Sequence, residues 1–481
     1  MSKIVDKVME EFLKIAEIPR PSHHEEKIAD YLCAWAKEHG IAAERDEIGS
    51  VIMEKPAAAG CEVMPMVILQ AHMDMVCVAA EGVKYDPLND PIHVIREGTV
   101  LRADGTTLGA DDGMGVAMAL TVLADDTLCH GPIRAIFTPS EEDDMASKEM
   151  NPKYFGGKYL INLDWEQTGT LCNACAGSIT WEMSHRADWE SSPRETRTMT
   201  ISLSGLRGGH SGIDIHRRRA NALVTLAAAM THLRRGGVSF RIADFSGGDT
   251  PNAIPDHAHV VFAVEEEEMD QAMALVEDFS IAFQKAYGHT ETGYSLEVGV
   301  EEQAPAKVLR RETGYALVNL LMMVPYGIHT MSADCEGLVE SSANTGMLHI
   351  DEKRITATCL LRSSAVYQAT YLSHACRTAA EVCGFEAQNT GTTPAWEPRR
   401  ESHLTEVACA VYEAQNGKPM TVMPVHAGLE CGGFAPKNPA LDMISIGPTL
   451  TGVHTPEERC DTEDVQITVE LLKEILRSLE Q

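Results

Sequence analysis

The sequence predicts an α/β protein with a mainly parallel central sheet and an inserted α+β sandwich domain. Apolar runs typical of buried strands recur in the first and last parts of the chain, and acidic or imidazole residues follow each run. The segment 193–394 lacks these polar strand ends. A chain of 481 residues with 44% hydrophobic content also exceeds what one core usually supports. We therefore expect two domains, formed by residues 1–192 with 395–481 and by residues 193–394.

The inserted segment contains strand-like and helix-like runs, which predicts the α+β sandwich. Period-two alternation indicates strands, whereas longer apolar runs that are rich in alanine or begin with acids indicate helices. Strands are expected at residues 198–203, 240–245, 258–264 and 355–361, and helices at residues 220–233 and 265–283.

The first polar strand end carries an imidazole and a carboxylate two residues apart. His72 and Asp74 close the apolar run 66–71, and residues two apart on a strand point to the same face. Asp111 follows in the glycine-rich segment 106–115, which runs into a helix-like stretch. We therefore expect the Asp111 carboxylate at a helix N-terminus with little bulk around it.

Three further strand ends repeat the pattern. They carry paired carboxylates, a single carboxylate and a second imidazole, namely Glu141 with Glu142, Asp164 and His454. Because open α/β sheets place ligands at the carboxyl ends of their strands, we expect all these residues to converge.

This set of residues predicts a two-metal hydrolase site. Imidazoles combined with carboxylates suit zinc, manganese or cobalt better than calcium, whose sites use mainly oxygen. One carboxylate must bridge the two ions, and Asp111 is the natural candidate because it lies centrally in the order of the motifs. The expected ligands are His72, Asp111, Glu142, Asp164 and His454.

Two carboxylates remain once the ligands are counted. Activation of water by metal needs a general base that is not itself a ligand, and we assign this role to Glu141. Asp74 fits a partner that orients the His72 imidazole and raises its basicity. A solvated loop or a hydrogen-bonded core histidine would explain any one strand end alone, but the complete set favours the metal site.

The motifs around these residues resemble a known family, the cytosolic nonspecific (aminoacyl-histidine) dipeptidases, which are dinuclear-zinc metallopeptidases. The similarity extends over nearly the whole chain. H-x-D at 72–74 and G-A-D-D-G at 109–113 mark the wider clan, whereas H-A-G-L-E-C-G at 426–432 and I-G-P-T-L-T-G-x-H-T-P at 446–456 are specific to the dipeptidase branch.

The resemblance implies the same ligand set. His72 and Asp164 would hold one zinc ion and Glu142 and His454 the other, with Asp111 bridging. The family's catalytic pair falls on Asp74 and Glu141, in agreement with the roles assigned above. The Asp111-Asp112 peptide bond is expected to be cis, as in relatives.

The resemblance also implies that the insert is a lid and, in many family members, a dimer interface. His210 would stabilise the oxyanion of the tetrahedral intermediate, within its own chain or across a homodimer. Arg362 would clamp the free carboxylate of a dipeptide with its bidentate fork. Asn252 and Gly428 complete the expected substrate-binding residues. Without the family match, a surface arginine and an ordinary turn would be the simpler interpretations.

The chain departs from the family pattern beside two of the ligands. Trp165 follows Asp164 where a small hydroxyl residue is usual, and Asp143 with Asp144 follows Glu142 where small residues are usual. A bulky indole would narrow the pocket, and extra negative charge would favour a basic substrate end or another metal. The departures therefore affect the expected substrate more than the reaction.

The expected activity is hydrolysis of dipeptides with a free C-terminal carboxylate, of Xaa-His type or broad specificity, by metal-activated water. An N-acyl amino acid amidohydrolase or a carboxypeptidase would use the same site on a different substrate. A non-catalytic relative that binds peptides or serves in an assembly would have lost a ligand or Glu141, and none is lost here.

Charge and cysteine content limit the kinds of partner and the cellular compartment that we expect for this protein. The net charge of −31, from 40 basic and 71 acidic residues, disfavours nucleic acid and anionic membranes as partners. The amphipathic start of the chain lacks the apolar core of a signal peptide. No run approaches the roughly 18 apolar residues that span a bilayer. We expect a cytoplasmic protein whose 13 cysteines are reduced.

Overall fold

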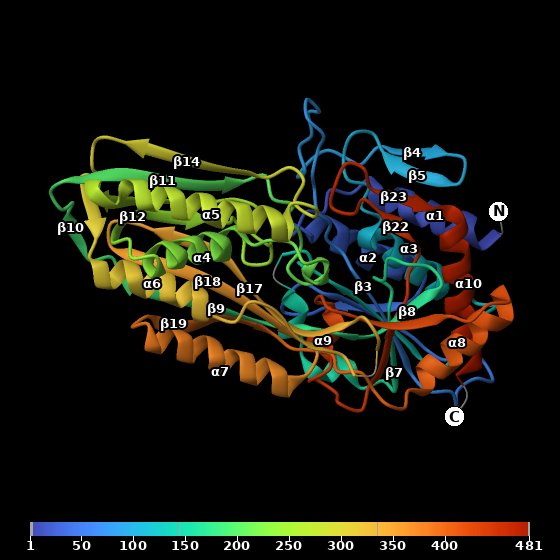
Figure 1. Ribbon diagram of the computed structural model, residues 1–481. Helices are drawn as coiled ribbons and strands as arrows, with labels where there is room; N and C mark the ends of the chain where they lie inside the picture. Colours follow the sequence, from blue (N-terminus) through green and yellow to red (C-terminus); the bar gives the residue numbers. More distant parts are fainter. Residues whose placement is uncertain (1–2, 144, 334, 480–481) are drawn as a thin grey trace. The chain divides into compact units, whose positions relative to one another are not determined.

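The chain forms two units, each with its own sheet (Figure 1). The computed structural model describes residues 3–143, 145–333 and 335–479, so Asp144 lies outside the described residues. Unit 1 comprises Met1–Cys175, Trp396–Val425 and Leu429–Gln481, and unit 2 comprises Ala176–Ala395 with His426–Gly428. The first boundary lies at Cys175 instead of the expected residue 192, because β9 (Gly177–Arg186) pairs with two strands of unit 2, β18 and β19.

Unit 1 is built on an eight-stranded sheet with the strand order β1-β2-β6-β3-β7-β21-β8-β20. Its strands are β1 (Ala42–Arg45), β2 (Val51–Lys55), β3 (Val67–His72), β6 (Ile133–Thr138), β7 (Tyr159–Asn162), β8 (Thr170–Cys175), β20 (Thr421–Val425) and β21 (Asp442–Ser445). The helices of unit 1 are α1 (Lys3–Ala16), α2 (Glu26–Glu38), α3 (Ala110–Leu123), α8 (His403–Asn416), α9 (Glu430–Phe434) and α10 (Thr462–Ser478), with 3-10 turns η1 (Ala146–Glu149) and η2 (Pro152–Phe155).

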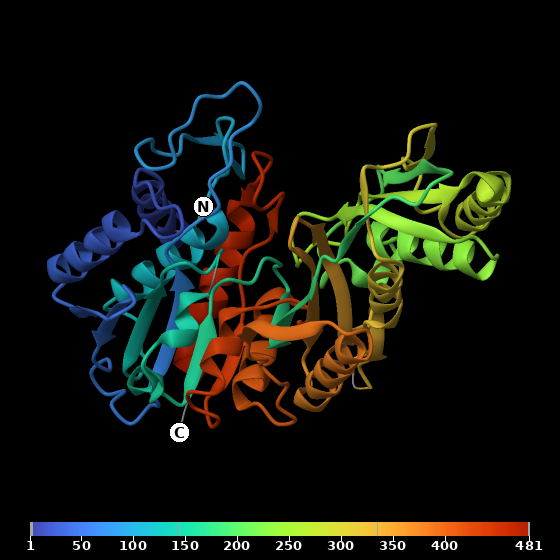
Figure 2. The same ribbon diagram turned by 90° about the vertical axis from the view of Figure 1, so that its left-hand side faces the viewer.

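The centre of this sheet is parallel, which confirms the predicted fold class. β3 pairs in parallel with β6 and β7, and β7 pairs in parallel with β21. A parallel sheet needs both faces covered. Along β3, Val67 and Leu69 pack into one core with the helices, whereas Ile68 packs into a second core on the other face. The first and last helices of the chain both belong to unit 1 (Figure 2), where α1 contacts α10.

A small antiparallel sheet brings the last part of the chain beside an early hairpin. Its strand order is β22-β23-β5-β4, and the strands are β4 (Val94–Glu97), β5 (Val100–Ala103), β22 (Leu450–Thr451) and β23 (Arg459–Asp461). The turn between β22 and β23 carries His454, so this small sheet anchors the second imidazole.

Unit 2 is an antiparallel sheet with the strand order β14-β11-β13-β12-β17-β18-β9-β19, and β16 pairs with β17. Besides β9, the strands are β11 (Thr196–Ser204), β12 (Phe240–Gly247), β13 (Ala258–Glu265), β14 (Ser295–Glu301), β16 (Gly327–Met331), β17 (Val339–Ile350), β18 (Arg354–Ser363) and β19 (Glu386–Thr393), and β10 (Trp189–Ser191) pairs separately with β15 (Lys307–Leu309). The helices are α4 (Ala222–Arg235), α5 (Met269–Tyr287), α6 (Arg311–Met323) and α7 (Val366–Val382), with 3-10 turns η3 (Ile215–Arg217) and η4 (Glu266–Glu268).

The four helices of unit 2 share one core with the sheet, which makes the expected two-layer α+β sandwich. Alternate residues of β11, Met199, Ile201 and Leu203, are fully buried in this core with side chains from all four helices. The strands and helices predicted within the insert are present, except that the helix expected from residue 265 starts as the short turn η4 before α5.

One expectation about the cysteines is wrong. Cys61 and Cys129 form a disulfide with a Cα–Cα distance of 6.3 Å, whereas the other cysteines are free. Cysteines 68 residues apart in sequence reach bridging distance only through the fold, so sequence spacing gave no sign of the pair. Across the described ranges, every helix is too short or too polar to cross a membrane.

Candidate metal centre and substrate-binding residues

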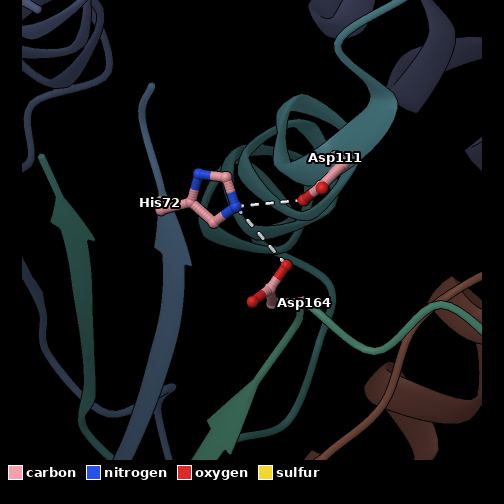
Figure 3. Close-up of side chains that lie close together, drawn as sticks. All are labelled: His72, Asp111 and Asp164. Atoms are coloured by element: carbon pink, nitrogen blue, oxygen red, sulfur yellow. Dashed lines mark hydrogen bonds and ion pairs between the residues drawn. The ribbon is translucent and has the colours of Figure 1, made fainter. Parts of the chain in front are cut away.

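Three predicted ligands converge at the carboxyl end of the parallel sheet in unit 1 (Figure 3). His72 is the last residue of β3, and Asp164 follows the neighbouring strand β7. Asp111 lies at the start of α3 but has φ −80° and ψ 111°, outside the helical range. The His72 Nε2 atom is 3.0 Å from Asp111 Oδ1 and 3.4 Å from Asp164 Oδ1. The predicted convergence of these strand ends is therefore present.

His454 approaches the same carboxylate from the C-terminal part of the chain. Its Nε2 atom lies 3.2 Å from Asp111 Oδ2 and 2.8 Å from Glu142 Oε2. The two oxygens of Asp111 thus face two different histidines. His454 adopts the left-handed conformation, φ 63°, which is uncommon for a residue other than glycine and recurs at functional sites.

Groups of ligand atoms within 4.8 Å of one another mark where ions fit among the described residues. The groups are His72 with Asp111 and Asp164, Asp111 with Glu142 and His454, and His72 with Glu141 and Glu142. The first two groups share Asp111 and divide the five predicted ligands between them. The third group contains Glu141, which is therefore close enough to act on a water molecule at the centre.

The charges of this cluster suit a divalent cation. Burial raises the pKa of Glu141, Glu142 and Asp164, and neighbouring carboxylates raise it further. Burial would also raise the pKa of Asp111, but hydrogen bonds with His454 and His72 lower it far below its usual range. Glu142 Oε1 is buried and has no hydrogen-bond partner among the residues that the structure describes. A metal ion would both neutralise the buried acids and occupy this oxygen.

Asp74 connects His72 to the loop that carries both glutamates. Its Oδ1 atom is 3.4 Å from His72 Nδ1 and accepts a hydrogen bond from the Glu141 N–H at 3.0 Å. Its Oδ2 atom accepts hydrogen bonds from the Glu142 N–H at 3.2 Å and from the Ser22 hydroxyl at 2.8 Å. Asp74 can therefore orient the imidazole and the main chain of the expected base together.

The residue after Asp111 has a positioning role that the sequence did not reveal. The Asp111-Asp112 peptide bond is cis, which confirms the prediction. Asp112 accepts hydrogen bonds from the His72 N–H at 3.2 Å and from the Gly115 N–H at 3.0 Å. Its side chain thereby joins the end of β3 to the start of α3.

Two further residues that the sequence did not reveal hold the loop before Asp111. The Glu458 carboxylate accepts hydrogen bonds from four consecutive main-chain N–H groups, residues 108–111, at 2.7, 2.9, 2.8 and 3.3 Å. The Arg20 guanidinium donates to the carbonyl groups of Met73, Asp74 and Gly109 at 2.9, 2.8 and 2.5 Å. Both charged side chains are almost completely buried, a property that depends on tertiary packing.

The glycines of the G-A-D-D-G motif make room for Arg20. A Cβ atom at Gly109 would lie 2.7 Å from Arg20 Nη2, and one at Gly113 would lie 2.6 Å from the same atom. Real Cβ atoms do not approach so closely, and Arg20 is fixed by its three carbonyl partners. The spacing of these glycines is therefore a packing requirement of the buried guanidinium.

The two departures from the family pattern have defined surroundings. The Trp165 indole packs against the second core of unit 1 and donates its N–H to Thr170 Oγ1 at 2.6 Å. Asp143 Oδ2 lies 2.8 Å from His23 Nε2, and both side chains are more than half exposed, at 66% and 53%. Asp143 therefore adds a solvated carboxylate, in contact with an imidazole, next to Glu142.

The predicted lid residues lie in unit 2. His210 Nε2 is 3.3 Å from Arg362 Nη2. Burial and then the positive charge of Arg362 lower the pKa of His210 to about 4, and burial lowers the pKa of Arg362 to about 10. The main-chain carbonyl of Asn252 accepts a hydrogen bond from the Ser211 N–H at 2.7 Å. The side-chain oxygen of Asn252 accepts a hydrogen bond from the Thr250 hydroxyl at 2.8 Å. Gly428 belongs to the short segment His426–Gly428 of the same unit.

A model of the peptidase family M20/M25/M40 matches residues 68–478, and the chain belongs to this family. The cytosol non-specific dipeptidase of Escherichia coli (strain K12) is 35% identical over 470 residues, 96% of each chain. The chain is also similar to the crystal structure of the aminoacylhistidine dipeptidase from Vibrio alginolyticus, with 34% sequence identity and a TM-score of 0.88. The alignment covers 99% of this chain and 97% of the Vibrio chain.

A more distant structure, the aminopeptidase PepT from Bacillus cereus, shares the fold at 16% identity, with a TM-score of 0.56 over 99% of each chain. The resemblance predicted from the motifs is confirmed, and so is the predicted class of metal-dependent peptidase. The two relatives that match almost end to end are both dipeptidases by name.

Proposed function

We propose that this protein hydrolyses dipeptides with a free C-terminal carboxylate at a centre of two divalent metal ions. One observation carries the proposal: two ligand groups share Asp111, whose two oxygens face His72 and His454. Such a shared carboxylate is the arrangement that two-metal hydrolases need. The names of the two end-to-end relatives support dipeptides as the substrates.

The side chains of unit 1 divide into ligands and helpers in this proposal. His72 and Asp164 would hold one ion, Glu142 and His454 the other, and Asp111 would bridge. When bound, the ions supply Lewis acidity, which polarises a carbonyl and lowers the pKa of water.

Glu141 takes a proton from the attacking water and delivers it to the leaving amine. The Asp74 carboxylate accepts a hydrogen bond from the Glu141 N–H and so holds the main chain of the base. The same carboxylate keeps the imidazole of His72 in place. The proton taken from water thus reaches the leaving amine by way of one carboxylate.

The side chains of unit 2 bind the substrate and its transition state. His210, which burial keeps neutral, donates a hydrogen bond to the oxyanion, and Arg362 binds the terminal carboxylate. Asn252 and Gly428 contribute further polar contacts. These roles rest on the family resemblance and on the approach of His210 to Arg362.

We further propose zinc as the ion, with manganese or cobalt as substitutes, because the set combines imidazole and carboxylate ligands. The name of the E. coli relative supports a cytoplasmic location. The family resemblance supports a homodimer in which His210 acts within one chain or across the interface. Sedimentation of the purified protein tests the dimer, and metal analysis after purification without added metal tests the ion.

A screen of dipeptides against the metal-loaded protein tests the proposed reaction. Xaa-His and β-alanyl-His are compared with other dipeptides and with their N-acetylated forms. Hydrolysis of the free dipeptides alone is expected. Preference for the acetylated forms would instead identify an N-acyl amino acid amidohydrolase or a carboxypeptidase. Well under one metal ion per chain after zinc loading would identify a non-catalytic relative.

A further inference from the structure

Two buried polar side chains of unit 2 carry atoms without a partner. His426 is 6% exposed and Arg362 is 8% exposed. Within the described part of the chain, His426 Nδ1 and Arg362 Nε have no hydrogen-bond partner. A buried polar atom left unpaired destabilises a folded protein, and more so when the group is charged. Two such atoms in one cluster point to a ligand that pairs with both.

Gly212 brings His426 and Arg362 together. A Cβ atom at Gly212 would lie 2.2 Å from the His426 carbonyl oxygen and 3.1 Å from both Cδ and Nε of Arg362. Only a residue without a side chain fits at position 212 against both the His426 main chain and the Arg362 side chain. His210 extends the cluster, because its Nε2 atom is 3.3 Å from Arg362 Nη2.

The Ser342 hydroxyl contacts the other nitrogen of the His426 ring and so influences which nitrogen carries the proton. The Ser342 hydroxyl on β17 lies 2.7 Å from His426 Nε2. When the hydroxyl donates to Nε2, the proton of the neutral ring sits on Nδ1, and the unpartnered nitrogen becomes a donor. Burial and then the positive charge of Arg362 lower the pKa of His426 to about 3, so the ring is neutral near pH 7.

The cluster therefore presents one positive charge and a set of N–H donors. Arg362 supplies the charge and a fork of donors, and His426 supplies one further N–H. A carboxylate matches this arrangement, since it carries one negative charge and can accept several hydrogen bonds around its two oxygens. A terminal amide matches poorly, because it is uncharged and its NH₂ group would face donors.

We propose that His426 binds the free C-terminal carboxylate of the dipeptide together with Arg362 and so determines the requirement for that carboxylate. This inference rests on the proposed dipeptidase function. It adds a specificity-determining residue to the arginine that the family resemblance suggested. The H-A-G-L-E-C-G motif thereby has a chemical use for its first residue.

The test compares Ala-His with its C-terminal amide as substrates of the metal-loaded protein. In His426→Gln, the amide reaches the Nε2 position and keeps a partner for Ser342, but the Nδ1 donor is lost. In His426→Asn, the side-chain amide nitrogen occupies the Nδ1 position. His349→Gln is the matched control, since His349 is an exposed histidine on β17, the strand that carries Ser342.

His426→Gln is expected to raise KM for Ala-His about 10- to 100-fold, as for loss of a charge-assisted hydrogen bond, with a much smaller change in kcat. Turnover of the amide should stay the same, so the preference for the free carboxylate collapses. His426→Asn should restore most of the preference, and His349→Gln should leave it unchanged. An unchanged preference in His426→Gln overturns the proposal.

Two further measurements keep the outcome decisive. If His426→Gln does not fold, Ser342→Ala, which releases the ring tautomer, should lower the preference several-fold, and an unchanged preference overturns the proposal. If the wild-type protein hydrolyses no dipeptide, the proposed function fails. The carboxylate site is then tested alone by calorimetry with N-acetyl-alanine. Weaker binding to His426→Gln than to wild type supports the site, and equal binding overturns it.

Discussion

Glu458 holds Asp111 by its main chain: Glu458 Oε1 accepts a hydrogen bond from the Asp111 N–H at 3.3 Å and another from the Ala110 N–H at 2.8 Å. The other carboxylate oxygen accepts from the two preceding N–H groups. An anion thus lies on one side of the loop that presents the bridging carboxylate. The positively charged Arg20 guanidinium contacts the same loop, because it donates a hydrogen bond to the Gly109 carbonyl.

Replacing Glu458 with glutamine should weaken metal binding. Glutamine removes the charge and places an NH₂ group against main-chain N–H groups, so the loop and Asp111 shift. Loss of a group that orients a ligand typically lowers metal affinity about 10- to 100-fold. Competition with a chelator measures the affinity. Glu457→Gln is the control, because the adjacent Glu457 side chain is 80% exposed. Equal zinc affinity in Glu458→Gln and wild type would refute the positioning role.

Adding a methyl group at Gly113 should destabilise the protein. The new Cβ atom would lie 2.6 Å from Arg20 Nη2, and overpacking of this kind costs about 1–3 kcal/mol in free energy of unfolding. Unfolding by urea of the metal-free Gly113→Ala variant measures the loss. Gly156→Ala serves as control, because a Cβ atom at Gly156 meets no atom within 4 Å. Similar stability of the two variants would show that Arg20 moves aside.

Glu141→Ala should separate metal binding from turnover. If Glu141 is the base, the variant keeps nearly two ions per chain while kcat falls about 10²- to 10⁴-fold, the usual contribution of general base catalysis. If Glu141 is instead a ligand with His72 and Glu142, metal content falls as well. Elemental analysis and steady-state kinetics on the same preparation distinguish the two cases. Retained turnover would exclude Glu141 from the base role.

Acid should destabilise unit 2 through His426. Burial and the charge of Arg362 hold its pKa at about 3, below the value of about 6.5 for an unfolded chain. Between these values the unfolded state binds more protons, so the free energy of unfolding rises with pH and falls as pH drops from 6.5 toward 3.

The corresponding experiment follows urea unfolding between pH 4.5 and 7. His426→Asn should show a shallower dependence of stability on pH than wild type, because one buried group no longer resists protonation. His349→Gln, an exposed substitution in the same unit, should follow the wild-type curve. Parallel curves for wild type and His426→Asn would mean that His426 is protonated without cost in the folded protein.

Local sequence patterns were sufficient to predict the fold class and the grouping of the proposed metal ligands. His72 and Asp164 close apolar strands, and the shared polarity of parallel strands brings such ends to one edge. The same pattern predicted His454, although β22, a strand of the small second sheet, lies between β21 and this residue.

Features that depend on contacts between distant segments could not be predicted from the sequence. Arg20 and Glu458 look like ordinary charged residues in the sequence, and only burial against main-chain groups gives them a role. The boundary at Cys175 depends on the pairing of β9 with β18 and β19, which come much later in the chain. Likewise, the unpartnered nitrogen of His426 exists only in the packed structure.

The position of β21 in the sheet has a consequence for the order in which the protein matures on the ribosome. β7 and β8 are successive strands, yet β21, synthesised much later, lies between them. Until it arrives, both neighbours have an open strand edge that a chaperone or another nascent chain can pair with. His454 and Glu458 are synthesised after β21, so the proposed second metal site is complete only when nearly the whole chain has been made. A product that terminates before β21 would lack both the strand between β7 and β8 and the proposed ligand His454.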